Sequence, residues 1–368
     1  MFNLKKFHNY KLFLKTNKEY KKIVFYSEGS IHDHFYLPFI NICLSKKIPF
    51  TYISSENIKP FLDEDNISKF FYIGDSFTRT LFFLTLNCKN LITTTPDLNN
   101  FHLRKSNNCK NYIYFFHSMC SVKTIYNNNA FSHYDTILTA NKFHTEEFKN
   151  YYFTNSNVKI LNIGYPKIDE LYFKSKLSAK TSHIKSILIA PSWGDEKNTF
   201  NKYSDLIKIL IDSSYNITFR PHPVTFIKSN SFIKKIEKQF SNSNNFKISN
   251  KKQNVDDYIL NDLIITDWSG SAVEYALATS KPSIFINTNQ KIRNKNCNLK
   301  DINNSFEVYF RKNIGQSLEL TNLMNLPKMI SNYDISLYEE KIEGFRKKFL
   351  YNFINTEEKI NNFLNSIK

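Results

Sequence analysis

Short apolar runs alternate with amphipathic stretches along most of this chain, and their spacing predicts strands joined by helices. In the first half, strands are predicted at residues 23–26, 50–53, 91–93, 112–116, 136–138 and 158–161, with a helix over 36–44. In the second half, strands are predicted at 186–190, 216–219, 246–248, 263–266 and 283–286. Strand and crossover repeated in this way indicate parallel sheets that are covered by helices on both faces.

The same pattern divides the chain into two parts. Residues 172–185 are polar and interrupt the alternation, so we interpret them as an interdomain linker. A chain of 368 residues is too long for one compact α/β unit and suffices for two. We therefore predict an α/β fold with Rossmann-like domains at residues 1–175 and 186–345. Residues 346–368 are predicted to form a helix that packs back on the first domain.

The segment 266–271 is the strongest candidate for a binding site. It follows a buried strand and opens a helix, and ligands of parallel sheets bind beyond the carboxyl ends of strands. Ser269, Gly270 and Ser271 offer backbone N–H groups and hydroxyls at the positive end of a helix dipole, which suits a diphosphate. Glu274 is placed to accept hydrogen bonds from ribose hydroxyls. The structural alternative is that Ser271 caps the helix and Glu274 completes a capping box.

Two histidines follow predicted strands in opposite halves of the chain. Arg220 and His222 stand in an Arg-Pro-His-Pro loop that the prolines stiffen, and a cation with an imidazole there can neutralise phosphate charge. His117 is a candidate general base, because neutral imidazole accepts a proton near pH 7. For both histidines a structural role is the alternative, for example a ring that is satisfied by a loop carbonyl.

Other polar residues after strands have weaker assignments. Ser192 and Trp193 would border the same cleft, although core packing is the more usual role of a tryptophan. His32 and His34 are candidates for the acceptor side, with an exposed loop as the alternative. His144, Glu146 and Glu147 are interpreted as the solvated start of a helix. The five cysteines lack metal spacing, and Walker, HExxH and DxD motifs are missing, so neither a metal nor a cofactor is expected.

The formal net charge of +17 suggests an anionic partner, namely nucleic acid, a membrane surface or a charged substrate. Zinc-finger spacing, an RNP-type strand and an arginine-rich arm are all missing, so nucleic acid is not expected. No secretory signal or membrane-spanning run is recognised, which predicts a cytoplasmic protein. Residues 2–20 mix apolar and lysine side chains, so they form either a helix lying on an anionic membrane or one packed on its own domain. A lysine-rich surface without any partner is the remaining alternative.

Taken in order, these segments resemble the CDP-glycerol glycerophosphotransferases of teichoic-acid and capsule synthesis. The matching segments are Tyr112–His117, the Ala-Pro-Ser-Trp loop at 190–193, Arg220–Pro223, and Thr266–Ser269 with Glu274 and Lys281-Pro282. Thr94–Asn99 is also similar to a segment of capsule- and lipopolysaccharide-associated members. The resemblance covers roughly residues 90–290, and the order and spacing of the motifs make it more specific than any one of them.

The resemblance implies a GT-B fold, in which the two domains face each other across a cleft and the second holds cytidine diphosphate. It implies that His117 deprotonates the acceptor hydroxyl and that His222 supports the donor pyrophosphate. The expected donor-binding set is Ser192, Trp193, Arg220, Asp267, Ser269, Gly270, Ser271 and Glu274. The hydroxyl of a cell-surface glycan or lipid-linked acceptor would attack the glycerol-bearing phosphorus and release CMP.

The chain departs from the family pattern at two positions. Ser118 follows the first histidine, where the family often has glycine, and this change lies on the acceptor side. Gly270 separates two serines that are often adjacent in the family, and glycine still permits close backbone approach. Two alternatives remain: a GT-B glycosyltransferase that uses a nucleotide sugar, and a non-catalytic nucleotide- or glycan-binding protein.

Overall fold

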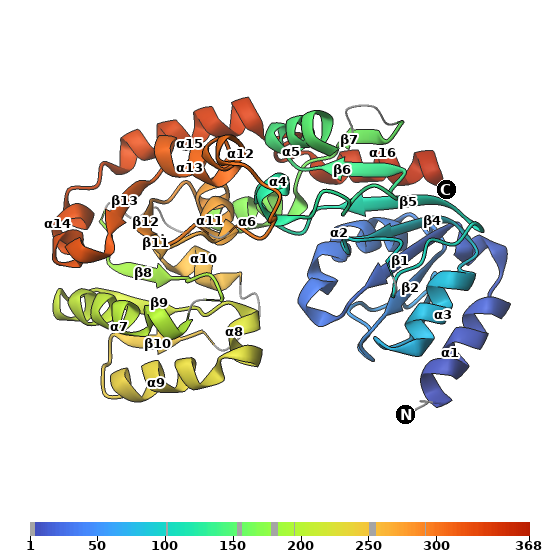
Figure 1. The fold of residues 1–368 in the computed structure, drawn as a ribbon, viewed down its shortest axis with the longest axis horizontal. Helices are drawn as coiled ribbons and strands as arrows, with labels where there is room; N and C mark the ends of the chain where they lie inside the picture. The colour runs from blue at the N-terminus through green and yellow to red at the C-terminus, as the bar shows by residue number, and fades with distance from the viewer. Residues whose placement is uncertain are drawn as a thin grey trace.

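The computed structural model describes residues 4–100, 102–152, 157–177, 183–194, 196–249, 255–290 and 292–368. Two parallel sheets lie side by side and confirm the predicted α/β class (Figure 1). The first sheet has the order β3-β2-β1-β4-β5-β6-β7 and the second the order β10-β9-β8-β11-β12-β13. Each sheet therefore runs outward in both directions from its first strand, as in a Rossmann fold, and ligands of such sheets bind where the order reverses.

The strands of the first sheet are β1 (Ile23–Ser27), β2 (Phe50–Ser54), β3 (Ser68–Tyr72), β4 (Cys88–Thr93), β5 (Cys109–Phe115), β6 (Thr136–Thr139) and β7 (Lys159–Asn162). Those of the second are β8 (Ser186–Ile189), β9 (Asn216–Phe219), β10 (Phe246–Ile248), β11 (Leu263–Thr266), β12 (Ser283–Asn287) and β13 (Gln316–Glu319). All predicted strands are present, and the edge strands β3 and β13 are additional.

Helices cover both sheets. In the first half they are α1 (Leu4–Lys15), α2 (Ser30–Ser45), α3 (Phe77–Thr85), α4 (Val122–Ile125), α5 (Lys142–Glu147) and α6 (Pro166–Lys176). The second half adds α7 (Glu196–Asp212), α8 (Pro223–Lys228), α9 (Asn230–Phe240), α10 (Asp256–Leu260), α11 (Gly270–Thr279), α12 (Leu299–Asn303), α13 (Phe306–Asn313), α14 (Leu326–Ser331), α15 (Ile335–Phe349) and α16 (Thr356–Ile367). The helix predicted at 36–44 is thus the second part of α2.

The central strands are apolar because helices bury both of their faces. All residues of β1 are buried, and Phe25 packs edge-to-face against Tyr36 and Phe39 of α2 and against Phe50 of β2. Each fully buried side chain of this size contributes about 1.5–3 kcal/mol relative to exposure. This rigid aromatic core fixes the loops that follow the strands.

Two predicted boundaries are wrong. The linker prediction at 172–185 fails at its start, because α6 continues to Lys176, and Tyr172 packs edge-to-face on Phe353. The predicted single helix at 346–368 is broken between α15 and α16. There Asn352 and Ile354 adopt positive φ, and the side-chain amide of Asn352 donates to the carbonyl of Asn162 at 2.7 Å.

The last helix returns to the first sheet, where Figure 1 shows α16 in red near the teal and green strands. It contacts α2, and the side-chain amide of Asn90 in β4 donates to the carbonyl of Ile367 at 2.9 Å. The chain therefore crosses between the two sheets twice, first through α6 and again after α15.

Gly344 offers a simple test of the packing of α15. It lies inside the helix, and an added Cβ would meet nothing within 4 Å. Because glycine costs a helix interior roughly 0.5–1 kcal/mol relative to alanine, Gly344→Ala is expected to raise the free energy of unfolding by about that amount. Urea denaturation measures the change. Gly164→Ala is the control and should lower stability, since Gly164 has φ +104° and its Cβ would lie 2.6 Å from the carbonyl oxygen of Tyr351.

Candidate functional site

A cavity of about 460 Å³ lies between the two sheets. Its walls are the segments that follow the carboxyl ends of β1, β4 and β5 in the first sheet and of β8, β9 and β11 in the second. Most predicted site residues line it: His32, His117, Ser118, Ser192, Trp193, Arg220, His222, Ser269, Gly270, Ser271 and Glu274. Asp267 and His34 are not among the lining residues. The cavity thus spans the point of strand-order reversal in both sheets, where ligands of such folds bind.

The turn at the start of α11 forms one wall. Ser269 is the N-cap residue, and its hydroxyl accepts from the amide of Ser271 at 3.3 Å. The capping-box alternative is wrong, because Ser271 lies inside the helix and Glu274 bonds elsewhere. The Glu274 carboxylate accepts from the hydroxyl of Tyr165 at 2.7 Å and from Nζ of Lys167 at 2.6 Å. The turn keeps the positive end of a ten-residue helix at the cavity wall.

Gly270 is one of the points where the second domain contacts the first. A Cβ at this position would lie 3.3 Å from the carbonyl oxygen of Met119, closer than most real contacts of a Cβ. Met119 is fully buried and follows His117 and Ser118. The missing side chain therefore lets the turn at Ser269–Ser271 and the loop after β5 approach each other closely.

The guanidinium group of Arg220 uses only some of its hydrogen-bond donors in contacts with the protein. Its guanidinium carbon lies 4.5 Å from the ring centre of Tyr258, and its Nε lies 3.9 Å from a carboxylate oxygen of Asp257. Its Nη1 is buried and has no hydrogen-bond partner among the described residues. A phosphate oxygen in the cavity would satisfy this group with a charge-assisted hydrogen bond.

His222 begins α8 and is fixed through one ring nitrogen. Its Nδ1 accepts from the backbone amide of Val224 at 3.1 Å, which assigns the proton of the neutral ring to Nε2. The partner of Nδ1 is a backbone amide. The structural alternative, in which a loop carbonyl satisfies the ring, therefore does not describe this contact.

His117 belongs to the first domain and lines the same cavity as the Ser269–Ser271 turn. Its ring meets that of His32 edge-on at 5.2 Å, and its Nδ1 is buried without a partner among the described residues. Burial, followed by the nearby His32 and Lys167, lowers the pKa of His117 to about 3. The imidazole is therefore neutral at pH 7, and a bound anion would raise its pKa and make it a stronger base.

Asp267 and Ser192 hold the donor loops together. One carboxylate oxygen of Asp267 accepts from the amides of Ser192 and Trp268 at 2.8 and 2.7 Å, and the other accepts from the Ser192 hydroxyl at 2.8 Å. Asp267 is also buried and lies outside the lining of the cavity. Its predicted contact with the donor is replaced by contacts that position the loop after β8.

His34 lies apart from His32 although both are on α2. Positions two apart on a helix point to different sides. His34 lines a separate small cavity with Phe116, Pro166 and Glu170, and burial lowers its pKa to about 2. The structure therefore brings His32 to the candidate site and leaves His34 outside it.

Several lining residues are not among those expected from the sequence, chiefly Glu28, Lys167, Tyr258 and Arg293. Lys167 stands directly after Pro166, the first residue of α6, and its ion pair with Glu274 joins the two halves of the chain. A Gly-Tyr-Pro-Lys run after a predicted strand was the available signal for Lys167. Tyr258 lies in the short helix α10 and Arg293 in an irregular segment, and neither directly follows a predicted strand.

The interpretation of residues 144–147 as a solvated helix start is wrong for two of its members. His144 is fully buried against Phe116, and its Nε2 lies 3.0 Å from the carbonyl oxygen of Cys120. Glu147 is also buried and accepts from the amides of Val122 and Lys123 at 2.5 and 3.2 Å. Both side chains fix the loop that follows His117.

The buried His144 predicts loss of stability in acid. Burial lowers its pKa from 6.5 to about 3, so below pH 6.5 the unfolded chain binds a proton that the folded chain does not. Unfolding free energy is therefore lost as the pH falls through this window. Between pH 7 and 5, His144→Gln should lose about 2 kcal/mol less than the parent protein. Urea titrations at the two pH values measure the difference, and an unchanged pH dependence would contradict the assignment.

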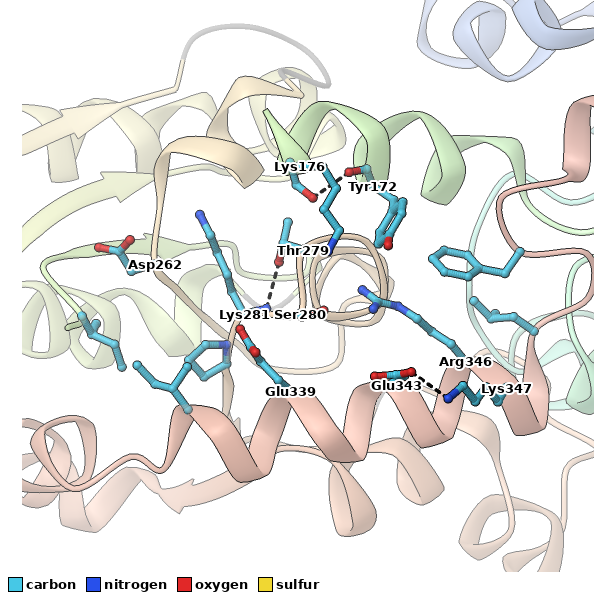
Figure 2. A pocket seen from close by; sticks show the side chains of 16 residues that line it. Tyr172, Lys176, Asp262, Thr279, Ser280, Lys281, Glu339, Glu343, Arg346 and Lys347 are labelled. Carbon is cyan, nitrogen blue, oxygen red and sulfur yellow. Dashed lines mark hydrogen bonds and ion pairs between the residues drawn. The ribbon is translucent and has the colours of Figure 1, made fainter. Parts of the chain in front are cut away.

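A second cavity, of about 600 Å³, lies where the chain crosses between the sheets (Figure 2). Its described lining residues include no histidine or cysteine, and several charges already have protein partners. Lys347 pairs with Glu343, Nζ of Lys281 donates to two backbone carbonyls, and Nε of Arg346 donates to the carbonyl of Leu277 in α11. The Arg346 contact joins α15 to α11, and the others lie within α15 or between Lys281 and the end of α10, so we interpret these charges as structural and place the candidate chemistry in the smaller cavity.

Comparison with known families now gives a direct result. The model of the CDP-glycerol:poly(glycerophosphate) glycerophosphotransferase family matches residues 10–306. The chain belongs to this family. An uncharacterized protein of Methanocaldococcus jannaschii is 26% identical over 325 residues, which cover 83% of this chain. The match covers 51% of that relative, so the chain spans about half the length of the relative it matches.

Solved structures agree with the GT-B-like fold of this family member. A UDP-GlcNAc 2-epimerase from M. jannaschii, solved with UDP-GlcNAc and UDP, has a TM-score of 0.60 at 12% identity, covering 94% of this chain and 99% of that one. An Anabaena protein solved with UDP and glucose has a TM-score of 0.53 at 10% identity, covering 94% of this chain and 100% of that one. A Rickettsia africae glycosyltransferase has a TM-score of 0.51 at 12% identity, covering 94% of this chain and 97% of that one. At these identities the likeness concerns the fold alone.

Proposed function

We propose that this protein transfers glycerol phosphate, or a related polyol phosphate, from a CDP-activated donor to a hydroxyl of a cell-surface glycan or lipid-linked acceptor. The observation that carries the proposal is one cavity with a neutral histidine on one wall and, on the other, a cation and a helix start that suit a phosphate. His117 lies on the first wall, and Arg220 lies with the Ser269–Ser271 turn on the second. Membership of a glycerophosphotransferase family supports the class of reaction.

In the proposed reaction, the donor pyrophosphate lies against the start of α11 and the Arg220 guanidinium, with His222 beside it. The acceptor oxygen attacks the phosphorus that carries the polyol and forms a new P–O bond. The P–O bond to CMP breaks, and CMP leaves with the electron pair. The proton of the acceptor hydroxyl passes to His117. Groups that are already fixed before the donor binds lose little energy to reorganisation during the reaction.

A glycosyltransferase acting on a nucleotide sugar is the second candidate, and the structural neighbours solved with UDP ligands favour it. The two reactions differ in the bond that breaks. Attack at phosphorus releases a nucleoside monophosphate, whereas attack at the sugar carbon releases a nucleoside diphosphate.

Product analysis separates the candidates. Purified protein is incubated with CDP-glycerol or with UDP-sugars and a lipid-linked or glycan acceptor, and released nucleotides are resolved by chromatography. We expect CMP from CDP-glycerol. Release of UDP from a UDP-sugar, without CMP from CDP-glycerol, would overturn the proposal. Nucleotide binding without turnover of any donor would instead favour a non-catalytic binding protein.

We also propose a peripheral membrane contact through α1. Tyr10 and Phe13 bury one side of this helix in its own domain, while Leu4, Leu12 and Leu14 are exposed among lysines. Within the described residues, no helix combines the length and apolar character needed to cross a bilayer. Flotation with phosphatidylserine vesicles should weaken when Leu12 and Leu14 are both changed to glutamate. Undiminished flotation would remove α1 as the contact.

A further inference from the structure

Residues 292–298 form a strap that leaves the second sheet after β12 and docks on the first domain. The amides of Arg293 and Asn294 both donate to the carbonyl of Thr124 in α4, at 2.9 and 3.1 Å. The side-chain amide of Asn294 donates to the carbonyl of Lys123 at 2.9 Å and to Oδ1 of Asn128 at 3.2 Å. Asn294 is fully buried, so the strap is held by the first domain although it belongs to the second.

The strap brings Arg293 to the candidate site. Its guanidinium carbon lies 4.4 Å from the ring centre of Trp193, and both residues line the cavity with Arg220 and His222. Stacking on an indole fixes the direction of a guanidinium without using its hydrogen-bond donors. Within the described part of the chain the Arg293 side chain makes no hydrogen bond, so its donors remain available to a ligand.

The position of Arg293 therefore depends on both domains at once. Trp193 follows β8 of the second sheet, whereas Thr124 belongs to α4 of the first. If the domains separate, the strap loses its docking site on α4 and the backbone of Arg293 loses its anchor. Arg220, by contrast, contacts Asp257 and Tyr258 of its own domain, so its cation stays in place in either state.

We propose that Arg293 is a catalytic cation that enters the site only when the strap is docked, and that it stabilises the charge on the departing nucleotide phosphate. This inference rests on the proposed transfer reaction. As the bond to the leaving nucleotide breaks, its phosphate oxygen takes the electron pair and gains one negative charge. The same charge develops for CMP and for a nucleoside diphosphate, so the role does not depend on which donor is used. If Arg293 reaches the site only when the two domains are together, bond cleavage is restricted to the state in which the cavity wall that carries His117 faces the donor.

The test compares Arg293→Ala with Lys228→Ala. Nζ of Lys228 also lies over the Trp193 ring, at 5.2 Å, but Lys228 is exposed on α8 and does not line the cavity. We expect Arg293→Ala to lower kcat by about 10²–10³-fold, as for loss of one charge-stabilising donor, with nucleotide Kd changed less than about 3-fold. Lys228→Ala should stay within about 3-fold in both. Equal kcat effects in the two variants, or a loss confined to Kd, would overturn the proposal.

Asn294→Ala tests the strap itself. It should lower kcat on its own, and the double variant with Arg293→Ala should be no slower than Arg293→Ala alone, because both changes remove one interaction. If the two single-variant losses in kcat multiplied in the double variant, the proposed coupling would be overturned.

Should no donor turn over, the proposed function fails, and the strap is tested by fluorescence of Trp193 in a Trp268→Phe background. CDP should then change the emission, and Asn294→Ala should abolish that change while calorimetry still detects CDP. A change that persists in Asn294→Ala would overturn strap docking.

Discussion

Replacing His117 with alanine is expected to lower kcat by about 10²–10⁴-fold while CDP still raises the melting temperature. The size follows from the usual contribution of a positioned general base. Nucleotide binding should survive because His117 belongs to the first domain, whereas Arg220 and the Ser269–Ser271 turn belong to the second. Release of CMP measures turnover, and thermal shift measures binding.

His34→Ala is the matched control for this experiment. His34 is also a histidine of low pKa in the first domain, but it lies outside the cavity. Its replacement should leave kcat within a few-fold of the parent value. Normal turnover in His117→Ala would remove His117 from the mechanism, and equal losses in both variants would point to a general disturbance of the first domain.

The central strands could be predicted because helices bury them on both faces. The four residues of β11 and the five of β1 are apolar almost without interruption, and that signal does not depend on tertiary context. The edge strand β13 shows the opposite case. Only Leu318 among its four residues is buried, so its polar sequence carries no strand pattern and its pairing with β12 depends on the neighbouring strand.

Candidate site residues were predictable where they directly follow a buried strand. Arg220 comes directly after β9, His117 and Ser269 follow the ends of β5 and β11 within three residues, and the parallel topology then carries them to one cavity. Arg293 lies far beyond the end of β12, and only the docking of its strap on α4 places it there. Asp267 follows β11 as predicted, yet its carboxylate turns to Ser192 because the neighbouring loop supplies better-placed donors. Position along a strand therefore predicts location more reliably than it predicts contact.

The two departures from the family pattern occupy one place in the structure. The loop that begins with Ser118 and Met119 meets the turn at Ser269–Ser271. There a Cβ on Gly270 would lie 3.3 Å from the Met119 carbonyl oxygen. A serine at 270 would press its Cβ against the backbone of the fully buried Met119. The glycine is therefore explained by the way the first domain's loop crosses the turn, which the isolated turn sequence could not reveal.

Arg220→Ala is expected to weaken binding of CDP by about 10–150-fold. Its Nη1 is buried and lacks a partner among the described residues, and a hydrogen bond between charged groups contributes about 1.5–3 kcal/mol. The guanidinium also stacks on Tyr258 of the same domain, so it is positioned before the nucleotide arrives. Isothermal titration calorimetry with CDP measures the change in Kd.

Arg220→Lys separates charge from geometry. Lysine keeps the charge but lacks the planar fork and stacks less well on Tyr258, so an intermediate loss of CDP affinity is expected. Lys247→Ala, on the edge strand β10 of the same sheet, removes an exposed charge and should leave Kd within about 2-fold. If Arg220→Ala bound CDP as Lys247→Ala does, the buried guanidinium would serve only Asp257 and Tyr258. The donor phosphates would then have to be held by the α11 turn and His222 without it.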